Sequence, residues 1–412
     1  MNRHRVTITV LDKDKTLRIG HRTGVSLHCH TLYSKEMLDF VPFYARQFPG
    51  VSWWYERVCA KYERETGGPP NFSSGYWEPP LTARALLDSE TSSLNQLGLE
   101  GIVSITDHDT IQANLDLIGE SEGSAAPISM EWTVPFGNAY FHMGVHNLPA
   151  SRAREISELL LGYTYAEAPP DLQRLRDLLA MMNDMPEVLI VLNHPFWDIE
   201  MAGQAKHDRG LREFTELFGS FIHAIEINGF RPWAENELAR GLAERLGLPI
   251  VSGGDRHCLH ANAMINSTHA ATFDEFVGEV RQDRRSNVII LPEYRLPLLY
   301  RQISSIAKVL GHYPHFPPER RHWRQRVYFD AGDGEGLQTL AASSNGTVPL
   351  WQTLSVLALT WAGHRSLRPL VSELFGTDLY LGTDRRHEVF EPAFQPIAGS
   401  QRIGDRREKI AA

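Results

Sequence analysis

The stretch "GVSLHCH", residues 24–30, decides the fold and raises the question of function. Apolar residues alternate with polar ones, and the run ends in two histidines around Cys29. Alternate side chains of a strand point the same way, so His28 and His30 leave one face together and Cys29 leaves the other. The histidine pair fits half of a metal site, and it also fits two polar residues at the end of a strand. The rest of the chain must decide between them.

Six further stretches read as strands, because they are rich in Val, Ile and Leu and often bounded by Gly or Pro. Helical patterns lie between most of them, and Gly247 marks the stop of one helix. Strands that alternate with helices pair in parallel, and seven of them favour a closed or nearly closed barrel in an α/β fold. The further predicted strands are 101–109, 127–134, 140–148, 188–195, 223–229 and 248–257, and the predicted helices are 80–98, 169–186, 209–220 and 233–247.

The composition of the 412 residues, 42% hydrophobic and 22% charged, is ordinary for a soluble globular protein. The formal net charge of −9 argues against a broad nucleic-acid or membrane-surface footprint. The three cysteines contain no Cys-x-x-Cys pair, which fits reduced thiols and a cytoplasmic location. The charged start of the chain does not resemble a signal peptide, and the apolar runs are too short for a bilayer, so we expect no membrane contact.

Two regions interrupt the strand–helix alternation. Residues 36–80 form an aromatic insertion directly after the first predicted strand, where loops of a parallel barrel lie on the active face. The insertion is expected either to wall the site or to pack around its own tryptophans. After residue 297 the alternation stops, although 349–376 reads as helix. We therefore expect a barrel domain over 1–296 and a mostly helical extension with a polar tail over 297–412.

Chemically active side chains recur at the ends of the predicted strands. The carboxyl ends of the strands of a parallel barrel meet at one mouth. Imidazoles supply neutral nitrogen ligands and carboxylates can bridge two ions, so this set fits Zn, Mn or Fe. The residues are His28 and His30; Asp107, His108 and Asp109; Glu131; His142; His194; and Asp255, Arg256 and His257, while the sixth strand offers Glu226 and Asn228.

In these strand-end residues and their order, the chain resembles the PHP family (polymerase and histidinol phosphatase). Six motifs occur in the family's order between residue 24 and about residue 290: "LHCH", "ITDHD", the Glu of "SMEWT", the His of "FHMGVHNL", "NHP" and "GGDRH". The resemblance implies a distorted seven-stranded β/α barrel with two or three divalent metal ions, and "ITDHDT" is close to the motif of stand-alone phosphoesterases. The implied metal ligands are His28, His30, His108, Glu131, His142, His194, Asp255 and His257.

One position departs from the family pattern. The family usually has an Asp five residues after the second histidine of the first motif, and this chain has Lys35 there. A lysine is a cation and cannot ligate a metal cluster. Either Glu36 or Asp39 replaces the missing carboxylate, or one metal position is lost, so we expect two firmly held ions. Lys35 itself fits a phosphate contact or a plain surface position.

The chemistry implied by the resemblance is hydrolysis of a phosphate mono- or diester by a hydroxide held between two metals. Glu131 is the implied bridging carboxylate, and Asp107, next to His108, is expected to support the ligands. Arg256 or Arg209 is the candidate for charge near the leaving group. His207 and His260 are candidate general acids, and Glu226 is expected to support the site from the mouth of the barrel.

The substrate class stays open between a small phosphorylated metabolite, a nucleotide and a short oligonucleotide. The acidic balance favours a small substrate, and an aromatic insertion able to stack a base favours a nucleotide. One alternative is an amidohydrolase-like metal-dependent hydrolase of C–N or C–O bonds. Another is a degenerate barrel that serves as a binding or scaffold module, a reading that Lys35 favours.

Overall fold

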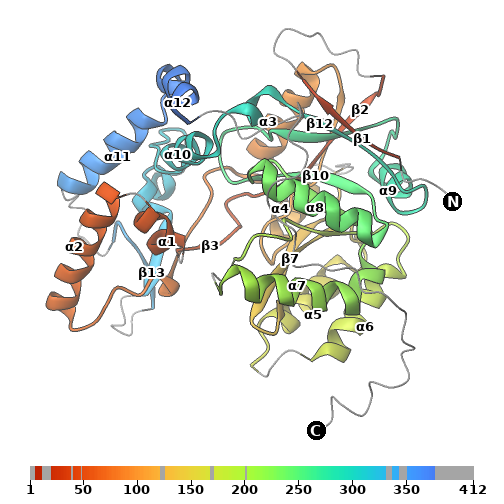
Figure 1. Cartoon of the computed structure of the whole chain (residues 1–412), viewed down its shortest axis with the longest axis horizontal. Helices are drawn as coiled ribbons and strands as arrows, with labels where there is room; N and C mark the ends of the chain where they lie inside the picture. The colour runs from red at the N-terminus through yellow and green to blue at the C-terminus, as the bar shows by residue number, and fades with distance from the viewer. Residues whose placement is uncertain are drawn as a thin grey trace. The chain divides into compact units, whose positions relative to one another are not determined.

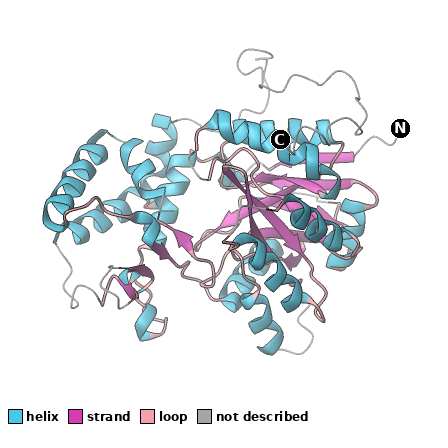
Figure 2. Cartoon of the chain, turned by 90° about the horizontal axis from the view of Figure 1, so that it is seen from below, coloured by secondary structure: helices cyan, strands magenta, loops and turns pink. Residues whose placement is uncertain are grey.

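A ten-stranded mixed sheet carries the fold in this computed structural model (Figure 1). The chain divides into two units, 1–379 and 380–412, and every described residue belongs to the first. Figure 2 distinguishes its helices from its strands. The structure describes residues 5–11, 20–38, 40–47, 49–120, 126–167, 171–199, 202–330, 336–342 and 350–375.

All seven predicted strands are present. Their cores are as apolar as the sequence predicted, and most of their residues are buried. They are β2 (Thr23–Cys29), β5 (Glu100–Val103), β6 (Met130–Phe136), β7 (Ala139–His146), β8 (Leu189–Leu192), β9 (Ala224–Asn228) and β10 (Ile250–Arg256).

The expectation of uniformly parallel pairing is wrong. β7 is antiparallel to both β6 and β8, whereas β2, β5, β8, β9 and β10 pair in parallel. β6 and β7 are joined by Gly137 and Asn138, because Phe136 pairs with Ala139. Two residues can close a hairpin but cannot carry a crossover to a parallel neighbour.

Three strands of the ten-stranded sheet were missing from the sequence prediction. They are β1 (Arg5–Val10), β11 (Met264–Thr268) and β12 (Arg285–Ile290). β11 runs antiparallel to both β2 and β12, and β12 pairs in parallel with β1. These strands extend the sheet beyond β2, in the order β1-β12-β11-β2-β10-β9-β8-β7-β6 with β5 also paired to β2.

A closed seven-stranded barrel is not confirmed. Within the described residues no ladder joins β5 to β6, and the β-type link between these two edges is a single parallel bridge from His108 to Glu131. The bridge is supported by two backbone hydrogen bonds, from the Asp109 N–H to the Glu131 carbonyl and from the Glu131 N–H to the Asp107 carbonyl. The edges therefore meet where the candidate ligands lie.

Amphipathic helices cover the sheet. Val25 and Leu27 of β2 share one apolar cluster with Phe276 of α9, and Cys29 lies in a second cluster with Leu86 of α3. Gly247 ends α8 in the left-handed conformation, as predicted. The helices are α3 (Ala83–Gln96), α4 (Gln112–Glu120), α5 (Ala153–Thr164), α6 (Leu172–Asn183), α7 (Gln204–Phe218), α8 (Trp233–Leu246) and α9 (Phe273–Arg281).

The insertion and the C-terminal extension share a second, four-stranded sheet of order β14-β13-β4-β3. No described helix is long and apolar enough to cross a membrane. The insertion supplies β3 (Glu36–Met37), α1 (Phe40–Gln47), α2 (Pro49–Thr66) and β4 (Gly75–Trp77). The extension supplies α10 (Leu298–Val309), β13 (Val327–Asp330), β14 (Leu337–Thr339), α11 (Leu350–Ala362) and α12 (Arg368–Phe375).

Candidate metal centre

Glu131 lies at the middle of the candidate centre and is fully buried. Its Oε2 lies 3.0 Å from the Nε2 of His28 and 3.0 Å from the Nδ1 of His108. Its Oε1 lies 3.2 Å from the Nδ1 of His142 and 3.2 Å from the Nε2 of His194. One carboxylate thus faces imidazoles from four separate segments, which is the position of a bridging ligand.

The remaining predicted ligands lie on the same cluster. His30 Nε2 is 3.5 Å from the Oε2 of Glu131 and 3.7 Å from the Oδ1 of Asp255. Asp255 Oδ1 is in turn 3.4 Å from the Nδ1 of His257. The imidazoles of His30 and His257 are stacked, with ring centroids 4.1 Å apart. The structure therefore brings all eight implied ligands together.

Glu36 of β3 adds a ninth ligand-type side chain. Its Oε1 lies 3.0 Å from the Nε2 of His257 and 3.4 Å from the Nε2 of His108. Lys35 points elsewhere, with its Nζ 5.2 Å from the ring centre of Tyr76. Asp39, the other candidate for the missing carboxylate, lies outside the described residues.

The donor atoms fit divalent cations. Several buried ligand atoms have a close neighbour of opposite type but no hydrogen bond, among them His28 Nε2, His30 Nε2, His108 Nδ1 and Glu131 Oε2. Buried polar atoms normally have a hydrogen-bond partner, so these nitrogens and oxygens have the signature of ligands. Four groups have donor atoms within 4.8 Å of one another: His30, Glu36, His108 and His257; His28, His30 and Glu131; His28, His194 and Glu226; and His108, Glu131 and His142.

The ligand rings are oriented by bonds from behind. His28 Nδ1 lies 2.6 Å from the Oε1 of Glu226, so its Nε2 faces Glu131. The other oxygen of Glu226 accepts the backbone N–H of His194 at 2.9 Å. Asn193 donates to the Oε1 of Glu131 at 2.9 Å. Such outer contacts fix the tautomer and the direction of metal-ligating groups.

Asp107 acts on the backbone around the centre. Its buried carboxylate accepts hydrogen bonds from the backbone N–H and the hydroxyl of Thr31. Burial raises its pKa to about 6, although the bonds from Thr31 work in the opposite direction. The hydroxyl of Ser34 then bonds both the Nδ1 of His30 and the backbone N–H of His108. Asp107 therefore fixes the loop that follows β2.

The charges of the centre compensate one another. Burial lowers the pKa of His28, but the charges of Glu131 and Glu226 outweigh it, so this pKa lies well above its ordinary value. Burial also lowers the pKa of His108, but the charges of Glu36 and Glu131 outweigh it and raise this pKa to about 10. Burial alone would raise the pKa of Glu131, yet the imidazoles, that of His28 foremost, hold it well below its usual range. A divalent cation would take the place of these protons.

Three ligands stand on left-handed backbone, with φ of 64° at His28, 25° at His194 and 49° at Asp255. Such a conformation is uncommon for residues other than glycine and costs about 1–3 kcal/mol each. At His28 the left-handed conformation interrupts the alternation of side chains along β2. Val25, Leu27 and then Cys29 would share a face in a regular strand, yet Cys29 packs in the opposite cluster and His28 turns to Glu226.

The two glycines before Asp255 make room for other side chains. A Cβ at Gly253 would lie 1.6 Å from the Oε1 of Glu226, and one at Gly254 would lie 1.7 Å from the Oδ1 of Asn262. Both glycines of "GGDRH" therefore leave space that other side chains occupy. At Gly253 this is the carboxylate of Glu226, which orients His28, and at Gly254 it is the amide of Asn262.

Arg256 is placed away from the cluster. Its guanidinium donates to the carboxylate of Glu90, to the Ser89 hydroxyl at 2.9 Å and to the Cys258 carbonyl at 2.7 Å. Arg209 lines a surface pocket at the β6–β7 turn that contains no candidate ligand. Neither cation is therefore positioned on the candidate ligands.

Each of the two candidate general acids is hydrogen-bonded to another group of the protein. The Nε2 of His207 lies 2.8 Å from the Pro195 carbonyl, and this side chain is buried. The Nε2 of His260 lies 2.9 Å from the Ser304 hydroxyl. Neither residue belongs to a group of candidate ligands.

Two aromatic side chains lie beside the centre: Trp77, from the insertion expected either to wall the site or to pack around its own tryptophans, and Trp197, which the sequence analysis did not single out. The ring of Trp77 lies 6.1 Å from that of His257, and the ring of Trp197 lies 5.0 Å from that of His194. Arg231, which pairs with Glu235, lies over the ring of Trp197, with its Cζ 4.6 Å from the ring centre. The signal was the position of Trp197 three residues after a strand-end histidine.

No family model matches the chain, and no curated protein matches it. It is similar to PsfC from Pseudomonas syringae, with 16% identity, 66% of this chain and 93% of that chain covered, and a TM-score of 0.40. It is also similar to an amidohydrolase from Chromobacterium violaceum, with 14% identity, coverages of 57% and 87%, and a TM-score of 0.32. A structure described as a metal-dependent phosphoesterase from Bifidobacterium adolescentis gives 14% identity, coverages of 64% and 96%, and a TM-score of 0.32. Since all three TM-scores are below 0.5, the assignment of the centre rests on its own residues.

Proposed function

We propose that the chain is a metal-dependent phosphoesterase that hydrolyses a phosphate mono- or diester. The observation that carries the proposal is the position of Glu131, whose two oxygens lie 3.0 to 3.5 Å from five imidazoles in a buried cluster. Mixed nitrogen and oxygen donors around one shared carboxylate are the arrangement of a site for two or more metal ions. The resemblance of the six ordered motifs to the PHP family supports the choice of phosphate esters.

The residues of the centre have different roles in the proposed reaction. Divalent ions held at this centre would lower the pKa of bound water and stabilise charge on phosphate oxygens. Glu131 would be shared between two of these ions, and Glu36 with His108 and His257 would hold another. Glu226 keeps the Nε2 of His28 directed at the cluster. Arg256 is not one of the reacting groups, because its guanidinium already donates hydrogen bonds to acceptors within the protein.

The two alternatives have less support. Amidohydrolases of this kind often use a carboxylated lysine on a strand as a bridging ligand, and none of the described strands β2 and β5 to β10 contains a lysine. A scaffold without metal would have no need to keep nine ligand-type side chains on one cluster. The test distinguishes both alternatives from the proposal: hydrolysis of C–N bonds would indicate the amidohydrolase, and absence of any activity would indicate the scaffold.

The test combines metal content with hydrolysis. Protein purified without a histidine tag is expected to contain two or three equivalents of Mn, Fe or Zn and to release p-nitrophenol from its phosphate mono- or diester. His194→Ala is expected to lower kcat by more than about 100-fold, because even groups that only orient a metal ligand are worth about 10- to 100-fold. His315→Ala, at an exposed histidine, is the matched control.

Two results would contradict the proposal. One is a chain without metal that neither Mn nor Zn converts into a phosphoesterase. The other is a His194→Ala variant with the wild-type rate. Release of amine from amide substrates, without phosphate release from any ester, would favour the amidohydrolase alternative.

A further inference from the structure

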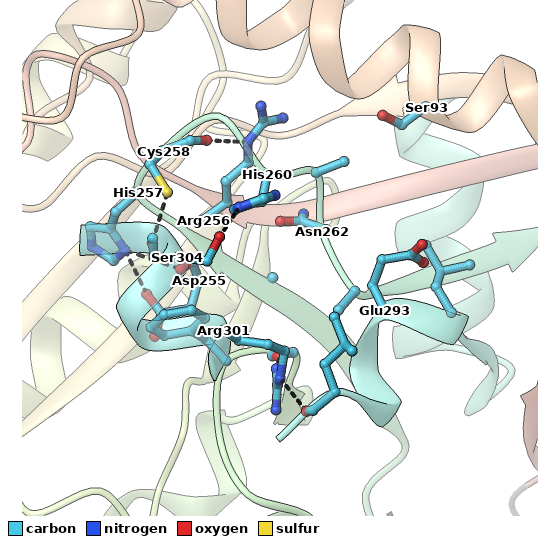
Figure 3. Close-up of a pocket in the computed structure, with 18 of the residues that line it drawn as sticks. Ser93, Asp255, Arg256, His257, Cys258, His260, Asn262, Glu293, Arg301 and Ser304 are labelled. Atoms are coloured by element: carbon cyan, nitrogen blue, oxygen red, sulfur yellow. Dashed lines mark hydrogen bonds and ion pairs between the residues drawn. The ribbon is translucent and has the colours of Figure 1, made fainter. Parts of the chain in front are cut away.

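A cavity of about 430 Å³ lies against the metal centre (Figure 3). Asp255 and His257, two of the candidate ligands, form part of its wall. Its other walls come from the end of α3, from the loop between β10 and β11, and from α10 of the C-terminal extension. The volume lies in the range of about 300–1,000 Å³ that is typical of small-molecule pockets.

The two arginines in the wall, Arg256 and Arg301, are already bonded within the protein. Arg256 pairs with Glu90, and both side chains are almost fully buried. Arg301 donates to the backbone carbonyls of Gly229 and, at 3.1 Å, of Leu296. These bonds attach α10 to the end of β9. The cavity away from Asp255 and His257 is therefore not built to bind an anion.

The rest of the wall is mainly apolar, with uncharged polar groups, the imidazole of His260 and one carboxylate, that of Glu293. Leu97, Leu291 and Tyr300 line it, together with the amide of Gln96 and the hydroxyl of Ser304. An apolar lining with a few hydroxyl and amide groups suits an uncharged organic group that carries hydroxyls. A bare phosphate would leave most of the space empty and would meet no free cation here.

We propose that this cavity binds the alcohol portion of the substrate, an uncharged, hydroxyl-bearing group of up to nucleoside size. The inference rests on the proposed phosphoesterase function. The phosphoryl group lies at the Asp255 and His257 end, and the alcohol portion extends toward α10. The extension after residue 297 then determines substrate specificity, because α10 contributes Tyr300 and Ser304 to the wall.

The test compares phosphate monoesters of increasing size: methyl phosphate, glycerol 2-phosphate, ribose 5-phosphate and adenosine 5′-monophosphate. The wild-type kcat/KM is expected to rise along the series. Ala261→Trp, which fills the cavity from the β10–β11 loop, is expected to lower kcat/KM for the adenosine ester at least tenfold. The rate with methyl phosphate and the metal content are expected to stay within twofold. Ala271→Trp, at an exposed position outside the cavity, is the control.

A second variant guards against a local folding effect. Leu97→Trp fills the same cavity from the end of α3 and is expected to give the same size-dependent loss. An equal loss for all four esters in both variants, or no loss for the adenosine ester, would overturn the cavity inference while leaving the phosphoesterase function intact. Failure of the metal-loaded wild type on every ester, methyl phosphate included, would overturn the function itself.

Discussion

At the scale of single residues, Glu36 lies among the candidate ligands, whereas Lys35 does not. Neighbouring residues of a strand point to opposite sides, so only one of Lys35 and Glu36 can face the histidines. In this chain Glu36 faces them and Lys35 lies over Tyr76. The sequence could name Glu36 and Asp39 as alternatives. It could not choose, because the choice depends on the pairing of β3 with the distant β4.

Glu36→Gln is expected to lower the metal content by about one ion per chain, because the third group of ligands loses its carboxylate charge. The measurement is elemental analysis after dialysis against metal-free buffer. Lys35→Ala is the matched control and is expected to keep the wild-type content. Equal metal content in Glu36→Gln and wild type would contradict the assignment of Glu36 as a ligand.

The histidines and carboxylates at the strand ends were predictable, since strand alternation and the shared edge of the sheet place them together. The left-handed backbone at His28 was not, because no residue type near it requires that conformation. Trp77 was also unpredictable as a neighbour of His257, since Trp77 belongs to β4 of the four-stranded sheet and His257 follows β10 of the ten-stranded sheet.

At the scale of elements, the ion pair between Glu90 of α3 and Arg256 of β10 joins a helix to the strand that contains the candidate ligand Asp255 and leads directly into His257. Both side chains are about 2% exposed or less. Glu90 also accepts hydrogen bonds from the Ser26 hydroxyl and the Asn262 backbone N–H. The pair therefore fixes β10 and the loop after it.

Glu90→Ala is expected to lower the free energy of unfolding by about 3 to 5 kcal/mol, because it leaves the Arg256 charge buried without its partner. The measurement is urea denaturation of metal-free protein. Glu100→Ala removes the exposed partner of Arg22 and is expected to leave stability unchanged, since solvent screens that pair. Similar midpoints for the two variants would contradict a structural role for the buried pair.

The apolar patterns predicted the seven strands. They did not predict the directions in which the strands pair, because these depend on the connections between strands. The two-residue turn at Gly137 and Asn138 forces an antiparallel hairpin. β11 and β12 escaped notice because "MINST" and "RSNVII" are short and partly polar. Their pairing with β2 and β1 is a tertiary effect that local pattern does not encode.

At the scale of the whole molecule, the insertion and the extension form one structure. β4 pairs with β13, with Tyr76 opposite Tyr328. The sequence presented these as two unrelated regions, because strand pairing between distant segments leaves no local pattern. The pairing also explains how the insertion reaches the centre, since β4 holds β3, and β3 carries Glu36.

His223, which belongs to none of the groups of candidate ligands, contributes to the pH dependence of stability. Its Nδ1 accepts the Ile190 N–H at 2.9 Å, so the ring is neutral, with Nε2 3.0 Å from the Asn183 amide oxygen. Burial, followed by the charges of Arg281 and Arg284, lowers its pKa to about 3. The unfolded chain takes up this proton near the ordinary value of 6.5, so stability is retained above pH 6.5 and falls as pH decreases toward 3.

His223→Asn is expected to be less stable at pH 7 but to lose less stability between pH 7 and pH 5. The difference in slope is at most about 1.4 kcal/mol per pH unit. Thermal unfolding at a series of pH values measures it, with His315→Asn as the exposed control. A wild-type slope in His223→Asn would show that this ring is not the titrating group.

The left-handed backbone at His28, His194 and Asp255 has a consequence for protein engineering. Glycine would relax the strain at each of these positions while removing a metal ligand. Libraries screened for heat resistance in chelating buffer would therefore enrich glycine there and yield robust but inactive proteins. Thermostable versions of this chain should be selected with Mn or Zn present, so that the energy of ion binding counts in favour of the native residues.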